Sequence, residues 1–277
     1  MKRSAGLLFL GLVLSTTAAG AEAAGCGVSK GLYDGWLALA KLPTTRAVLK
    51  NVFVAGKSAA TPDPAKQQAI GQEYQAFFQC LSDTAVPKDE HATQSYCREA
   101  GVDRLALLIC QTAVYLKNGR TGSSEFVDAF PAGKRGAEMI WDLNDIAGVG
   151  PKMVPAAAMF LPNGPAFKLI DELFLLVLDD REAAAAKYFN LWVYSSGPGS
   201  QHMDEQIKIL LRESPSVVVK RWAVLRQHQP RLKKLLSEMS ATLPDAELRK
   251  MRRGMAGFCS KDNLDCPEIL KIFGHPD

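Results

Sequence analysis

The sequence predicts an all-α protein that is held together by disulfides. Apolar residues recur at helical spacing along most of the chain, strand-like alternation is almost absent, and six cysteines follow an amino-terminal segment that resembles an export signal. The chain has 277 residues, of which 47% are hydrophobic, enough for a large core. We expect two helical regions, residues 24–160 and 161–277, that pack as one domain.

Residues 1–23 form a predicted signal peptide. Lys2 and Arg3 supply the positive start, residues 7–14 form a short apolar run of bacterial type, and the small residues around Ala21 and Ala23 offer cleavage sites. This run and all later ones are shorter than a membrane helix needs. We therefore expect a mature chain without a transmembrane segment, exported to the periplasm or the medium.

Cys26 allows an alternative. The tetrad Ala23-Ala24-Gly25-Cys26 resembles the end of a lipoprotein box, whose cysteine becomes lipidated. Ala23 stands where such boxes usually carry leucine, and the apolar run ends well before Cys26, so we favour the free form. Lipidation would also leave an odd cysteine.

The cysteines are predicted to be structural, because none has the C-x-x-C spacing of a redox or zinc site and an even number favours disulfides outside the cytosol. Cys259 and Cys266 flank a polar, turn-forming stretch, so we expect them to pair. Three connectivities then remain open for the other four. These are Cys26, Cys80, Cys97 and Cys110.

Two helices are predicted in the first region. Asp63-Pro64 is typical of a helix start, and five apolar residues follow at helical spacing. They are Ile70, Tyr74, Phe77, Phe78 and Leu81. A second helix runs from about Leu105 to Leu116, with Cys110 on or beside its buried face, and Asn118-Gly119 is its expected left-handed stop.

The stretch 165–178 is apolar on nearly every side and predicts a helix at the centre of the fold. Asp171 and Glu172 are its only acidic residues. Such a pair marks either a solvated end of the helix or a functional site, and we favour the solvated end.

Five further helices are predicted after residue 180. The first covers 183–194 and is followed by a break at 196–199, a second carries Met203 to Leu211, and a third starts at Ser214-Pro215 and runs through Leu225. Within the third, Val217 to Val219 leave a short strand open. The fourth begins at Gln229-Pro230, and the fifth begins at the capping-box sequence from Thr242 to Asp245.

The helices predicted after residue 180 are short and are joined by short loops, which is typical of helix-pair arrays. Residues 165–255 resemble HEAT and armadillo repeat proteins in outline, because the predicted helices have similar lengths and are separated by short loops. The resemblance implies a stacked array with a concave binding surface, and it assigns no functional residue. A compact irregular bundle fits nearly as well.

No motif predicts a metal or a cofactor. The four histidines, at positions 91, 202, 228 and 275, are never at metal-ligand spacing, C-x-x-C-H is absent, and Gly148-Val149-Gly150-Pro151 lacks the residues of a phosphate loop.

The segment Ser200 to Glu205 contains a serine, a histidine and acids, which suggests a hydrolase. A catalytic serine usually lies on a sharp turn and its histidine comes from elsewhere in the fold. We expect instead that Ser200 caps a helix, with Asp204 and Glu205 in its first turn.

Charge is distributed unevenly along the chain. Residues 215–261 hold eleven lysines and arginines against three acidic residues, a local net charge of +8. We expect the outward residues of this segment either to be a solvated face or to form a basic binding face. The candidates for that face are Lys220, Arg221, Arg226, Arg231, Lys233, Lys234, Arg249, Lys250, Arg252 and Arg253.

These observations favour a non-enzymatic, exported helical protein that binds another macromolecule, such as an adaptor, an assembly factor or a neutralising protein. A protein or an anionic envelope component is the expected partner, and export makes nucleic acid the least favoured. The alternative is an envelope hydrolase, acting on peptidoglycan or another wall polymer, whose site is assembled from residues distant in sequence.

Overall fold

In a computed structural model, the described part of the chain comprises residues 26–40, 64–86, 88, 96–97, 103–148, 164–225 and 228–262. Helices dominate these residues, and no strand occurs among them, which confirms the all-α prediction. The predicted signal peptide lies outside the described residues.

The helices differ widely in length, from single turns to five turns. They are α1 (Leu32–Ala40), α3 (Pro64–Asp83), α5 (Arg104–Lys117), α6 (Ser123–Ala129), α7 (Gly133–Gly148), α8 (Pro165–Leu178), α9 (Glu182–Tyr194), α10 (Gly197–Glu213), α11 (Pro215–Lys220), α12 (Trp222–Leu225), α13 (Gln229–Thr242) and α14 (Asp245–Asp262).

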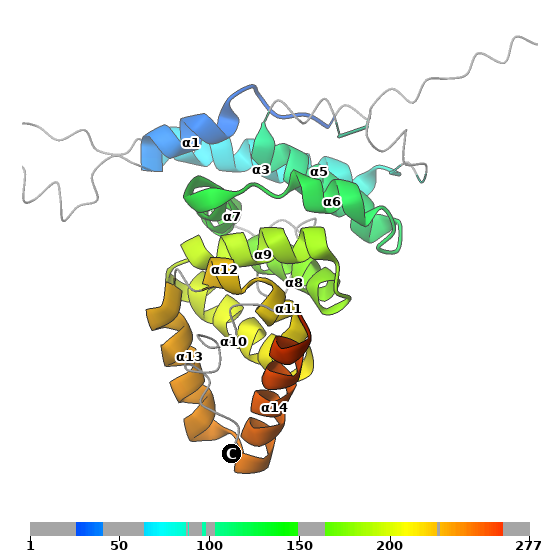
Figure 1. Cartoon of the computed structure of the whole chain (residues 1–277). Helices are drawn as coiled ribbons and strands as arrows, with labels where there is room; N and C mark the ends of the chain where they lie inside the picture. The colour runs from blue at the N-terminus through cyan, green and yellow to red at the C-terminus, as the bar shows by residue number, and fades with distance from the viewer. Residues whose placement is uncertain are drawn as a thin grey trace, which may run out of the picture.

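The helices stack in successive layers (Figure 1). The group α1, α3 and α5 lies at the top of the view, and α7 packs beneath α3 and against both α8 and α9. Below them α10 packs on α8, and α13 and α14 form a V whose arms meet at the other end of the molecule. One continuous apolar core runs through these layers, so α7 connects the first helices to the last ones.

The predicted boundaries of the first helices are confirmed. In α3 the side chains of Tyr74 and Phe77 are buried, and α5 ends at Asn118, with Gly119 in the left-handed region at φ 66°. The Lys117 ammonium donates to the carbonyl oxygens of Leu81, Ser82 and Thr84 at the carboxyl end of α3, so the last turn of α5 caps its neighbour.

Two disulfides tie these helices together. Cys26 is bonded to Cys80 of α3, and Cys97 to Cys110 of α5. The prediction that the four amino-terminal cysteines form two bridges is confirmed, and this pairing is one of the three that were open. The expected Cys259–Cys266 bridge lies outside the described side chains.

A break between α9 and α10 does occur, but it covers only Ser195 and Ser196 and not the predicted 196–199, because α10 already begins at Gly197. Pro198 is tolerated in the first turn of a helix, where no N–H partner is needed. Gly199 is required for packing: a Cβ atom there would lie 2.3 Å from the indole of Trp141, so only glycine lets α10 approach α7 this closely.

The third predicted helix after residue 180 is two helices, α11 and α12, with a bend at Arg221. The strand left open at Val217 to Val219 is not formed: all three valines are buried within α11. The bend lets α11 pack on α14 while α12 packs on α9.

No helix in the described ranges has both the length and the apolar character that crossing a membrane requires.

Candidate functional site

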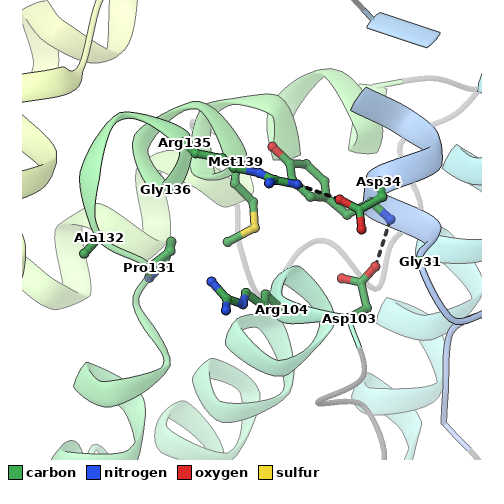
Figure 2. A pocket seen from close by; sticks show the side chains of 10 residues that line it. Gly31, Asp34, Asp103, Arg104, Pro131, Ala132, Arg135, Gly136 and Met139 are labelled. Carbon is green, nitrogen blue, oxygen red and sulfur yellow. Dashed lines mark hydrogen bonds and ion pairs between the residues drawn. The ribbon is translucent and has the colours of Figure 1, made fainter. Parts of the chain in front are cut away.

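Two hollows in the described part of the chain are relevant to function. The one with mixed charged and apolar walls, named the main cavity, lies between α1, the start of α5 and the turn that leads into α7 (Figure 2). The other, beside His202 and Asp204, is larger, at about 510 Å³, but more open to solvent. The main cavity has a volume of about 340 Å³ and combines charged with apolar walls. The charged residues are Asp34, Asp103, Arg104 and Arg135, and Pro131 and Met139 are among the apolar ones. These residues come from segments far apart in the sequence, and the sequence analysis selected none of them.

Asp103 fixes the inner wall of this cavity. Its carboxylate caps α5 by accepting from the backbone N–H groups of Leu105 and Ala106 at 2.9 and 3.0 Å. It also accepts from the backbone N–H of Tyr33 at 2.8 Å and from the hydroxyl of Tyr74 at 3.0 Å. The side chain is only 3% exposed, so these four donors from α1, α3 and α5 satisfy a buried charge.

The other charged groups of the cavity face solvent. An Arg135 nitrogen lies 2.7 Å from an Asp34 oxygen, in an ion pair whose side chains are about 70% exposed. Arg104 is exposed as well and has no ion-pair partner among the described residues. Among the described residues, therefore, no carboxylate neutralises the Arg104 guanidinium.

The described lining of the cavity supplies carboxylates, guanidinium groups, a phenol and apolar surface. The described residues that line it include no histidine, serine, cysteine or lysine. Burial, together with the neighbouring Asp142 carboxylate, raises the pKa of the Tyr33 phenol far above its usual value, so this hydroxyl stays protonated and donates to Asp142 at 3.0 Å.

A histidine–carboxylate pair lies elsewhere, between α8 and α10. His202 Nε2 is 2.7 Å from Asp171 Oδ1, and the amide of Gln206 donates to the same oxygen at 2.7 Å. The imidazole also packs edge-on against the ring of Phe167. No hydroxyl or thiol within the described ranges is hydrogen-bonded to His202.

The expected role of Ser200 is wrong. Ser196 occupies the N-cap position of α10, and Ser200 lies inside the helix, where its carbonyl accepts from Arg231 at 2.9 Å. Asp204 is therefore outside the first turn, and it is the ion-pair partner of Arg231 at 2.6 Å. The segment from 200 to 205 is part of the packing between helices.

Glu172 also differs from expectation, because its side chain is fully buried and not at a solvated end. Arg120 holds its carboxylate with two hydrogen bonds of 2.8 and 2.9 Å, and the Lys168 ammonium lies 2.6 Å away. Burial alone would raise the pKa of Glu172, but the hydrogen bonds from Arg120 and Lys168 outweigh burial and lower it. Asp171 is 39% exposed and binds His202.

Glu172 predicts a pH dependence of stability. A carboxyl whose pKa is lower in the folded protein stabilises it above the unfolded pKa, about 4.5, and loses this effect as the pH falls through the folded value. We expect Glu172→Gln to lower the free energy of unfolding at pH 7 by about 1 to 3 kcal/mol and to flatten its decline below about pH 4.5. Chemical unfolding across this range checks it. A Glu172→Gln variant whose free energy of unfolding falls with pH as steeply as that of the wild type would contradict the prediction.

The basic segment separates into two groups. Four of its cations are paired with acids: Lys220 with Asp180, Arg221 with Glu182, Arg231 with Asp204, and Lys234 with Glu238. Lys233 is exposed without an ion-pair partner in the described part of the chain, and Arg226 lies outside that part. The local charge of +8 overstates the free charge, because three of these acids precede residue 215.

The remaining cations lie together on α14. Arg249, Lys250, Arg252 and Arg253 have no ion-pair partner within the described ranges, and Arg252 alone is half-buried. We name these four residues the α14 basic face. Leu248, Met251 and Met255 form the buried side of the same helix.

No family model, curated protein or solved structure matches this chain. Function therefore has to be argued from the geometry alone. Within the described residues no three His, Cys, Asp or Glu side chains come close enough to hold a metal ion, and His91 and His275 lie outside them.

The two disulfides indicate the compartment in which the chain folds. Disulfides persist in oxidising environments and are rare in the cytosol. The pairing of Cys26 with Cys80 also occupies the sulfur that a lipid anchor would need. Both facts are consistent with an exported chain.

Proposed function

We propose that this protein is an exported binding protein of the cell envelope that holds an acidic protein partner through the α14 basic face. The observation that carries the proposal is the contrast between this face and the rest of the basic segment. Elsewhere in the segment four cations are paired with acids, whereas Arg249, Lys250, Arg252 and Arg253 have no acidic partner among the described residues.

The shape of α14 supports a role in recognition. Its apolar side is already in use, because Leu248, Met251 and Met255 are buried, and the helix packs on α11. Arg249, Lys250 and Arg253 are exposed, and α14 lies at the end of the molecule opposite to α1 and α3 (Figure 1). The outward side can meet a partner without rearrangement of the core.

The residue types favour a protein partner over a lipid surface. Three of the four cations are arginines, whose planar guanidinium binds a carboxylate with two parallel hydrogen bonds. A helix that lies in a lipid interface instead buries an apolar side, and in α14 that side is occupied by the core. Acidic side chains on a folded partner therefore fit this face best.

Export is part of the proposal. Residues 1–23 carry the features of a signal peptide, and the two disulfides suit an oxidising compartment. We prefer this function to an envelope hydrolase because Asp103 in the main cavity is fully bonded and because His202 has no hydroxyl or thiol partner within the described ranges.

Charge reversal on α14 tests the proposal. We expect Arg249→Glu combined with Arg253→Glu to reduce the cross-linked recovery of the envelope partner by about ten-fold or more, because two favourable charge contacts become repulsive. The matched control is Lys30→Glu with Arg181→Glu, two exposed residues without ion-pair partners among the described residues, which should leave recovery unchanged.

Salt gives a second readout of the same interaction. Recovery should fall steeply as ionic strength rises from about 0.05 to 0.5 M, because exposed charge contacts are screened. Equal recovery by the charge-reversed and control variants would overturn the proposal. Binding to anionic lipid vesicles that depends on Arg249 and Arg253, with no protein partner recovered, would assign the face to a membrane surface instead.

A further inference from the structure

The cavity between α1, α5 and α7 has the features of a ligand site, independent of the α14 basic face. We infer that it binds a small organic anion whose acidic group pairs with Arg104 and whose apolar part lies against Met139 and Pro131. Carboxylates and phosphate monoesters share this chemistry, since both accept bidentate hydrogen bonds from a guanidinium.

The cavity is of suitable size and is already formed. Its volume of about 340 Å³ is at the lower end of the range of about 300 to 1,000 Å³ that is typical of small-molecule pockets. Asp103 fixes the wall formed by α1 and α5 through bonds to α1, α3 and α5, so ligand binding would not have to order that wall. A rigid cavity of this size suits a small molecule.

Arg104 supplies the charge that the ligand must match. Its side chain extends from the first residue of α5 toward Pro131 and the tip of Met139 (Figure 2). It forms no ion pair with any described residue, although Asp103 is its neighbour in sequence. Four other donors already occupy the Asp103 carboxylate, and Arg135 holds Asp34, so Arg104 is left for an anion from outside.

The opposite wall adds a second cation and an acceptor. The ion pair between Arg135 and Asp34 is solvent-exposed, and such pairs contribute little to stability. Arg135 can therefore share its donors with a bound anion, while Asp34 can accept from an N–H or O–H group of the ligand. Met139, which is only 4% exposed, gives the floor an apolar surface.

Titration with defined probes tests the inference. The probes are benzoate and phenyl phosphate, which share the aromatic ring, with benzyl alcohol and inorganic phosphate as controls that lack the acidic or the apolar part. We expect one or both probes to bind the mature protein at least about ten-fold more tightly than either control. Preference between the two probes identifies the acidic group as carboxylate or phosphate.

Two variants assign the binding to this cavity. Arg104→Gln should lower the affinity for the probe by about ten-fold or more. Ala132→Trp, at an exposed position on the rim, should block entry to the cavity and lower the affinity to a similar extent. Arg181→Gln is the matched control and should bind as the wild type does.

The outcomes separate this inference from the proposed function. The variant with Arg249→Glu and Arg253→Glu should bind the probes normally, because α14 lies at the opposite end of the molecule from the cavity (Figure 1). Saturable binding of neither probe up to about 10 mM would overturn the inference. Unchanged affinity in Arg104→Gln would overturn it as well.

Discussion

Replacing Arg231 by alanine is expected to lower the free energy of unfolding by about 3 to 5 kcal/mol, because it leaves the Asp204 carboxylate, of limited exposure, without its charged partner and with only the indole N–H of Trp192 as a donor. The guanidinium, on α13, lies 2.8 Å from Asp204 on α10 and 4.4 Å from the centre of the Trp192 ring on α9. It also donates to the backbone carbonyls of Trp192, Ser195 and Ser200. One side chain thus holds three helices together.

Two further variants separate this network from charge alone. Arg231→Lys keeps the charge but loses the planar fork of donors. We expect its loss of stability to be more than half of the loss in the alanine variant. Lys234→Ala removes an ion pair of 4.0 Å between exposed side chains and should cost less than about 0.5 kcal/mol. Guanidinium unfolding with intact disulfides measures all three. If Arg231→Ala costs no more than Lys234→Ala, the network does not stabilise the fold.

Arg231 also shows where sequence reasoning reached its limit. Charge counting placed it with the candidate binding residues, because the acids nearest to it in sequence are few. Its partner Asp204 lies 27 residues earlier, on another helix. The same holds for Glu172, whose partner Arg120 is 52 residues away. Periodicity locates a residue on its own helix but does not show which helix will pack against it.

The helices themselves were predictable because their signals are local. Asn118-Gly119 ends α5 as expected, since glycine reaches the left-handed conformation without strain. The start of α10 was missed because Gly197, Pro198 and Gly199 are typical of a loop. Close packing against Trp141 and a first-turn proline placed these residues in a helix instead.

The main cavity left almost no signal in the sequence. Arg135 and Asp34 are 101 residues apart, and no motif connects them. The position of Asp103, just before the apolar run that begins at Leu105, is typical of an N-cap. That signal predicts two of its four hydrogen bonds. The bonds from Tyr33 and Tyr74 depend on the packing of three helices and could not be predicted.

Replacing Asp103 by alanine is therefore expected to cost more than the loss of a helix cap. A cap alone is worth about 1 kcal/mol. Here the buried N–H of Tyr33 and hydroxyl of Tyr74 also lose their acceptor, and each unsatisfied buried donor costs about 1 to 3 kcal/mol. We expect Asp103→Ala to lower the free energy of unfolding by about 3 to 5 kcal/mol, measured by chemical unfolding.

Asp103→Asn provides the matched control. The amide keeps one oxygen as an acceptor for Leu105 and Ala106 but replaces the other with a donor, which faces the N–H of Tyr33. We expect a loss between that of the alanine variant and zero, and faster hydrogen exchange at the Tyr33 amide than at the amides of α5. A cost of about 1 kcal/mol or less for Asp103→Ala would mean that the carboxylate only caps α5. A larger cost would mean that it joins α1, α3 and α5 and thereby sets the shape of the cavity.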